Sequence, residues 1–169
     1  MTIARSLITA IPRSIIRPIP RGGGDTGLAA VYWRVNVLSN NGGGNIGAIS
    51  EIYLQDSDSV TFDYTGGTVT GSSTVAGNIP AHAFDGLTAN DWAWNAGFPQ
   101  WVQMQFPEAK AVFRIGIQGV NSTLPGQDVN APNDMTIEYS DNGSDWTEIL
   151  AIDDQTSWGA GEVRYWDLQ

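Results

Sequence analysis

The chain has 169 residues, a hydrophobic fraction of 41 % and no cysteine. It is long enough for one domain with a sizeable core, and it excludes disulfides, thiolate metal sites and cysteine nucleophiles. The net charge of −10 argues against nucleic acid as a partner, because an acidic surface repels phosphates, and no apolar run approaches the roughly 18 residues of a membrane span.

Residues 1–27 differ from the rest of the chain. Their prolines forbid a continuous helix, and the Ile-Pro and Arg-Pro steps favour extended backbone. They carry four arginines and one aspartate, whereas residues 28–169 carry four cations and 17 acids. The segment is too apolar for a purely disordered tail, and the glycines at 22–24 indicate a flexible joint.

We therefore predict that residues 1–27 form an arm that lies on another subunit. Two alternatives stay open: a tail packed on its own domain, and arginines that only keep an apolar segment soluble. The residues expected to make the contact are Ile8, Ile11, Ile15, Ile16, Arg13 and Arg17.

From residue 31 onward the pattern is one of short segments with a period of two. The segments are 32–38, 49–55, 60–64, 101–106, 112–118, 135–140 and 163–168. The Asn142-Gly143 step marks a tight turn between two strands, because both residues tolerate positive φ. Residues 28–169 are therefore predicted to form an all-β antiparallel sandwich or jelly roll.

Three stretches of this region carry a family resemblance. PQWVQMQFPEAKAVFRIGIQGV (99–120), PNDMTIEYSDNGSDWTEI (132–149) and the loop AFDGLTANDW (83–92) together resemble the discoidin, or coagulation-factor type C, domain. The resemblance spans roughly residues 68–150 and implies a galactose-binding-like β-sandwich that binds ligands without catalysis.

The order of the pieces departs from the common arrangement of that family. VYWRVNVLSNNGGGNIGAISEIYL (31–54) resembles strands that usually close the domain, yet here it comes first. The chain therefore resembles a circularly permuted sandwich, a rearrangement that is tolerated where chain ends lie close together. Bacteriophage virion proteins resemble this layout of a permuted sandwich behind an N-terminal arm.

The loop 83–92 is the first candidate site. Asp85 offers a carboxylate, and a tight turn at Gly86 folds the carbonyls of His82 and Leu87 towards the same point, an oxygen-only set that suits Ca²⁺. The resemblance adds Glu51 as a further ligand and places Asn90 where the family has threonine. The alternative is a plain Asp-Gly turn.

A second candidate site is a glycan-binding end of the sandwich, where aromatic rings stack on sugars and polar side chains bind the hydroxyls. We expect Trp94 to be a better contact than Trp92, for which the resemblance implies the alternative of filling the core beneath the loop. Gln127 is a further loop candidate. The predicted contacts are Trp94, Asn95, Phe98, Asn121 and Trp158. Trp94 and Trp158 equally suit assembly contacts.

Catalysis is not expected. Two pairs of carboxylates, Asp85 with Asp91 and Asp153 with Asp154, could be considered as a catalytic acid and base. Each pair would have to face a single cleft and have two clearly different pKa values. The single histidine, His82, has no nucleophile motif beside it.

The resemblance thus implies a non-enzymatic bacteriophage structural protein, a tail or virion-surface component. Its arm would bind other virion subunits within an oligomeric assembly, and its sandwich would present a structural Ca²⁺ and a surface for host glycans. The alternative is a carbohydrate-binding module of a bacterial protein that is secreted or held at the cell surface.

Overall fold

The computed structural model describes residues 27–121 and 128–168, so the predicted arm lies outside the described part of the chain. Nearly all regular structure in that part is antiparallel β. The strands are β1 (Ala29–Val37), β2 (Ile46–Ile49), β3 (Glu51–Gln55), β4 (Thr68–Gly71), β5 (Trp92–Asn95), β6 (Gln100–Ala111), β7 (Arg114–Gln118), β8 (Met135–Ser140), β9 (Thr147–Ile152) and β10 (Val163–Asp167). Two 3₁₀ helices, η1 (Pro80–Phe84) and η2 (Asp128–Asn130), complete the set.

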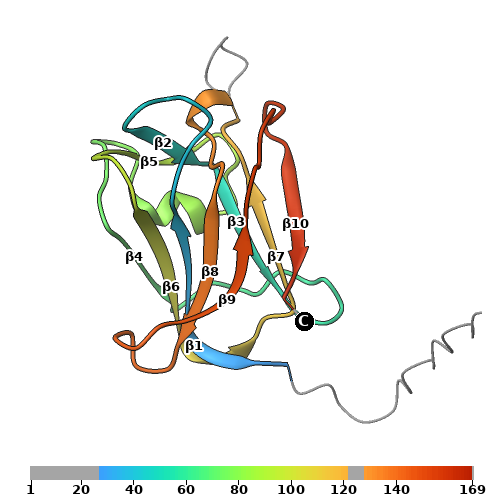
Figure 1. Ribbon diagram of the computed structural model, residues 1–169. Helices are drawn as coiled ribbons and strands as arrows, with labels where there is room; N and C mark the ends of the chain where they lie inside the picture. Colours follow the sequence, from blue (N-terminus) through green and yellow to red (C-terminus); the bar gives the residue numbers. More distant parts are fainter. Residues whose placement is uncertain (1–26, 122–127, 169) are drawn as a thin grey trace, which may run out of the picture.

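The strands form a β-sandwich, which confirms the predicted fold class. A five-stranded sheet has the order β4-β6-β1-β8-β9, and a three-stranded sheet has the order β10-β7-β3 (Figure 1). A short pair, β2-β5, extends the structure at one end. Every pairing between strands is antiparallel.

The core lies between the two larger sheets, and the period-two pattern explains how each strand contributes to it. In β1, Trp33, Val35 and Val37 are buried, and the residues between them are only half-buried. The same alternation buries the core-facing side chains Val102, Met104, Met135, Ile137, Ile52, Leu54, Ile115 and Ile117. One face of each sheet is therefore apolar, and the other is left for polar groups.

Strand β1 occupies the centre of the five-stranded sheet although it comes first in the described chain. It pairs with β6 on one side and with β8 on the other. Strand β3 similarly pairs with β7 in the other sheet. The N-terminal strands therefore complete both sheets of the sandwich.

The turn between β8 and β9 forms as predicted. Gly143 has a φ of 73°, and the Asn142 side-chain oxygen accepts hydrogen bonds from the backbone N–H groups of Ser144 (2.8 Å) and Asp145 (2.9 Å). These bonds fix the chain reversal, as expected of an Asn-Gly step.

The strand predicted over 60–64 is wrong. The segment has only an isolated bridge at Thr61, and Val60 is 59 % exposed rather than aligned with a buried face. The edge of β3 is instead closed by a side chain from this segment, as the site geometry below explains. No helix among residues 27–121 and 128–168 has the length and apolar character needed to cross a membrane.

Candidate functional site

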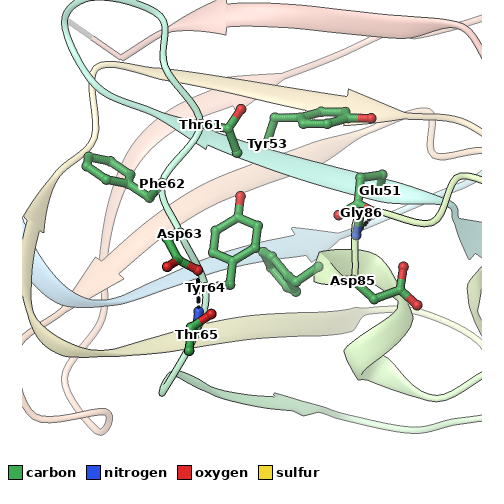
Figure 2. A pocket seen from close by; sticks show the side chains of 10 residues that line it. Glu51, Tyr53, Thr61, Phe62, Asp63, Tyr64, Thr65, Asp85 and Gly86 are labelled. Atoms are coloured by element: carbon green, nitrogen blue, oxygen red, sulfur yellow. Dashed lines mark hydrogen bonds between the residues drawn. The ribbon is translucent and has the colours of Figure 1, made fainter.

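A hollow with a volume of about 440 Å³ lies beside the free edge of β3. Three segments that are distant in the sequence surround it: β3, residues 61–65, and the end of η1 with the turn that follows (Figure 2). The lining residues are Glu51, Tyr53, Thr61, Phe62, Asp63, Tyr64, Thr65, Phe84, Asp85 and Gly86.

Tyr64 fixes the segment 61–65 against β3. Its hydroxyl donates a hydrogen bond to the Ile52 carbonyl (3.0 Å) and accepts one from the Leu54 N–H (2.8 Å). The Phe62 N–H also donates to the Leu54 carbonyl (2.9 Å). Burial raises the pKa of Tyr64, so the hydroxyl keeps the proton that it donates. The Tyr64 side chain thus satisfies backbone groups at the edge of β3 that a neighbouring strand would otherwise pair with.

The walls of the hollow are aromatic. The Tyr64 and Phe84 rings meet edge to face with centroids 5.3 Å apart, and Phe62 packs in the same manner on Phe106 at 5.9 Å. Such ring pairs hold their geometry through packing as well as burial. The hollow is therefore built on the core rather than on a free loop.

Tyr53 contributes a half-buried ring on the outer side of β3. Its ring lies 6.3 Å from that of Tyr165, and both lie over Gly116, where an added Cβ would approach Tyr165 Cε1 to 2.5 Å. The glycine leaves the room that the two rings occupy. Tyr53 therefore presents a positioned ring at the border of the hollow (Figure 2).

The charged groups of the hollow are all acids. Glu51 is 1 % exposed, and its carboxylate accepts a 2.8 Å hydrogen bond from the Gly86 N–H. Burial, reinforced by the nearby negative charge of Asp85, raises the pKa of Glu51 to about 7. Asp63 accepts a bond from the Thr65 N–H (2.8 Å), which lowers its pKa. Among the described lining residues there is no Arg, Lys or His, so the hollow suits ligand groups that donate hydrogen bonds and disfavours anions.

The loop after η1 has the tight turn that the sequence predicted. Gly86 has a φ of 71°, and the two oxygens of Asp85 accept bonds from the Leu87 N–H (2.7 Å) and the Asn90 side-chain amide (3.0 Å). The Leu87 carbonyl accepts the Asn90 N–H (2.8 Å). These are the bonds of an Asp-Gly turn, and they place Asp85 close to Glu51.

The proposed cation ligands come together only in part. Glu51 and Asp85 form a pair of like charges with no basic side chain lining the hollow around them, which is an arrangement that a divalent cation would neutralise. Asn90 presents an amide N–H to Asp85, and the His82 ring contacts the Asp91 carbonyl through Nδ1 (3.1 Å). In the described part of the chain no group of three or more His, Asp or Glu side chains is arranged to hold a metal ion.

Two of the predicted glycan contacts need correction. Trp94 is 0 % exposed and Trp158 is 5 % exposed, so neither presents a ring face to a ligand in this conformation. Trp94 lies across Gly47 in the β2-β5 pair and stacks on the equally buried Trp92 with centroids 4.5 Å apart. Trp158 donates its Nε1 hydrogen to the carbonyls of Pro132 and Gln155, both at 2.8 Å. Both rings belong to the core, as Trp92 does.

The remaining predicted contacts lie at separate places. Asn95 is exposed at the end of β5, and Phe98 is half-buried with its ring edge to face against Trp94. Asn121 is exposed and donates its side-chain amide to the Thr88 carbonyl (2.7 Å), so it adjoins the loop 85–90. Gln127 lies outside the described residues.

Sequence reasoning missed the hollow itself. Tyr53 shares a segment with Glu51, which the resemblance places beside the loop 83–92, but nothing in the sequence links Asp63 and Tyr64 to that loop. The available signal is the concentration of aromatic and acidic residues in 51–64.

Comparison with known families bears on the same region. The sequence model of one family, described as F5/8 type C domain, matches residues 68–169, more than half of the chain. The match starts at β4 and leaves β1, β2 and β3 outside it. Searches of curated proteins and of solved structures gave no match.

Proposed function

The chain belongs to the F5/8 type C, or discoidin, family, and from that premise we propose that it is a non-catalytic domain that binds a carbohydrate in the hollow beside β3. Domains of this family are generally binding modules without catalytic activity. The family supports a ligand-binding function, and the absence of catalysis, the ligand and its place are the proposal.

The observation that carries the proposal is the composition of the hollow. A half-buried tyrosine ring, Tyr53, borders a hollow whose polar groups are carboxylates and hydroxyls. Aromatic faces suit the C–H surface of a sugar ring, and carboxylates accept hydrogen bonds from sugar hydroxyls. The volume of about 440 Å³ lies within the range of small-molecule sites.

The proposal is tested by calorimetry with a panel of mono- and disaccharides. Tyr53→Ala and Asp63→Asn are expected to weaken binding at least about tenfold, a loss of about 1.4 kcal/mol. Leu38→Ala, which truncates a 42 % exposed side chain in the β1–β2 connection, serves as a control with unchanged affinity. Binding that survives both changes in the hollow would contradict the proposed location.

Calcium is the proposed structural ion of the same region. The carboxylates of Glu51 and Asp85 would hold it, with the Asn90 side-chain oxygen and the carbonyls of His82 and Leu87 as further oxygen ligands. Bound Ca²⁺ would supply positive charge beside the buried Glu51, and the residues themselves would tie the loop 85–90 to β3. The repulsion between Glu51 and Asp85 supports the proposal.

Melting temperature with and without Ca²⁺ is the test of this ion. Added Ca²⁺ is expected to raise the melting temperature of the protein and to leave that of Asp85→Asn unchanged, because only a ligand of the folded state stabilises it. Asp141→Asn, a change at an exposed acid in the β8–β9 turn, serves as the control that still responds. An equal response of all three proteins would argue against the site.

We also propose that the sandwich is circularly permuted relative to the common family order. The support is the position of β1, which lies outside the matched residues 68–169 yet forms the centre of the five-stranded sheet between β6 and β8. Strand β3 has the same relation to β7.

The biological setting that we propose is a bacteriophage virion, where residues 1–27 would anchor the domain to other subunits of an oligomeric assembly. The support is the contrast between an arginine- and isoleucine-rich arm and an acidic body. The alternative is a secreted or cell-surface carbohydrate-binding module whose arm is a linker. Deleting residues 1–27 is expected to leave the melting temperature unchanged but to abolish incorporation into virions; normal incorporation would contradict the anchoring role.

A further inference from the structure

The outer face of the five-stranded sheet carries a regular array of aromatic and amide side chains. Its residues stand in register across β4, β6 and β1: Gln105 lies between Thr68 and Tyr32, and Gln103 lies between Thr70 and Arg34. Trp101, one step further along β6, pairs with Asn36. All of these side chains point away from the core, because they alternate with the buried residues of the same strands.

A clamp of aromatic rings and one ion pair makes part of this face rigid. The Arg34 guanidinium lies 3.8 Å from the ring centroid of Trp146 and 5.6 Å from that of Trp101. Its Nε donates to the Glu138 carboxylate at 2.6 Å, and Nη2 donates to the same oxygen. The side chains of Arg34 and Glu138 are only 17 % and 13 % exposed. The rings are therefore held in place by a covered cation, which strengthens the contact.

The turn between β8 and β9 brings Trp146 onto this face. In Figure 1 that turn runs across the lower ends of β1 and β6. An added Cβ at Gly143 would lie 3.1 Å from the Tyr32 ring, and the Tyr32 and Trp146 rings meet edge to face at 6.3 Å. Trp146 thus forms a wall at one end of the array.

The glutamines of the array are free to bind. Gln103 and Gln105 are half-buried, and within residues 27–121 and 128–168 neither side chain has a hydrogen-bond partner. By contrast, the Gln100 side chain accepts a bond from Ser72 (2.6 Å), and the Gln118 side chain donates one to the Gly161 carbonyl (2.8 Å). Each free amide offers two donors and one acceptor oxygen in a partly dehydrated setting.

The charge of the array points to the ligand. In a chain with a net charge of −10, the β6–β1 rows from Tyr32–Gln105 to Asn36–Trp101 contain one charged residue, Arg34, and Glu138 neutralises it. A neutral surface of flat rings and amides complements a neutral polyhydroxylated chain, whose rings stack and whose hydroxyls both donate and accept. It lacks the broad apolar centre of a stable protein–protein interface.

We propose that this outer face, defined by Tyr32, Arg34, Trp101, Gln103, Gln105 and Trp146, is a second binding surface that takes an extended neutral glycan. It is separate from the hollow beside β3, which belongs to the other sheet. The proposal does not depend on binding in the hollow.

Calorimetry with neutral hexasaccharides tests the second surface. The probes are hexasaccharides of β-1,4-linked glucose, β-1,4-linked mannose, β-1,4-linked N-acetylglucosamine and α-1,4-linked glucose. At least one is expected to bind, with Trp101→Ala weakening it about tenfold or more and the double change of Gln103 and Gln105 to Ala weakening it about threefold to tenfold. If Trp101→Ala fails to fold, the double variant of Gln103 and Gln105 still tests whether this face binds the hexasaccharide.

Matched variants separate this surface from the hollow. Leu38→Ala and Tyr53→Ala are expected to keep hexasaccharide affinity, and Trp101→Ala is expected to keep the affinity of any monosaccharide bound in the hollow. Failure of all four hexasaccharides to bind, or binding that only Tyr53→Ala weakens, would overturn the second surface. Self-association that Trp101→Ala abolishes, without glycan binding, would also overturn it and assign the face to a second copy of the chain.

Discussion

The Glu51 carboxylate, 1 % exposed, accepts a 2.8 Å hydrogen bond from the backbone N–H of Gly86. This bond links β3 to the Asp85-Gly86 turn of the loop 85–90. The two bonded residues are 35 positions apart in the sequence. The bond places a buried carboxyl group in the wall of the hollow. The free energy of unfolding should therefore depend on pH.

Stability should fall as pH rises through neutrality in the absence of divalent cations. The folded-state pKa of Glu51, about 7, lies above the ordinary value of 4.5, so the folded state keeps this proton more readily than the unfolded state. The resulting stabilisation is complete below about pH 4.5 and is lost as the pH passes 7. Urea unfolding between about pH 5 and pH 8 in chelator measures it. Glu51→Gln should remove this part of the slope, and an identical pH profile in that variant would contradict the assignment.

Tyr64→Phe should destabilise the protein by about 1–3 kcal/mol. The change removes the hydroxyl that serves both the Ile52 carbonyl and the Leu54 N–H and leaves these backbone groups unpaired at the edge of β3. Tyr53→Phe is the matched control, because within the described residues its hydroxyl has no hydrogen-bond partner. Urea midpoints for the two variants give the comparison. Equal midpoints would show that the hydroxyl does not hold this edge.

Gly47→Ala should destabilise the β2-β5 pair by about 1–3 kcal/mol. An added Cβ would overlap the buried ring of Trp94, which has no room to move because Trp92 stacks on it. Gly159→Ala is the control, since its added Cβ would meet only Glu162 at ordinary contact distances of 3.6 Å and 3.7 Å. Thermal unfolding followed by tryptophan fluorescence distinguishes the two, and a neutral Gly47→Ala would contradict the tight packing.

Glu138→Gln should cost about 1–2 kcal/mol of stability and also weaken glycan binding to the outer face. The loss follows because Arg34 is covered by two rings and depends on Glu138 for its charge-assisted bonds. Glu108→Gln removes an ion pair with Lys110 in which the acid is 77 % exposed, so it should leave stability nearly unchanged. Denaturant titration of both variants measures the difference. A larger loss in Glu108→Gln would contradict the ranking.

The alternating residues of β1, β6 and β8 allowed much of the fold to be predicted. A period of two specifies which side chains enter a sheet core, and the Asn142-Gly143 step specifies where a hairpin reverses. The segment 60–64 shows the limit of that reasoning. Its alternation is equally regular, but it contacts β3 through an isolated bridge at Thr61, one backbone bond from Phe62 and the Tyr64 hydroxyl rather than as a strand.

The sites were harder to predict than the fold. The hollow unites β3, residues 61–65 and the turn at Gly86, and no local pattern reports that these segments meet. Trp94 was predicted to contact a glycan, yet the missing side chain at Gly47 on the paired strand makes room for its ring in the core. Only the loop 83–92 was recognised from its own residues, because an Asp-Gly turn is a local feature.

The most direct test of carbohydrate binding in the hollow is an NMR titration of the ¹⁵N-labelled protein with a saccharide that calorimetry identifies as a ligand. We expect the backbone signals of Tyr53, Asp63, Thr65 and Gly86 to shift together with one dissociation constant, and those of Asp63, Thr65 and Gly86 to shift much less in Tyr53→Ala at equal ligand concentration. Shifts that leave these four residues unmoved, or that persist in Tyr53→Ala with the same constant, would contradict it.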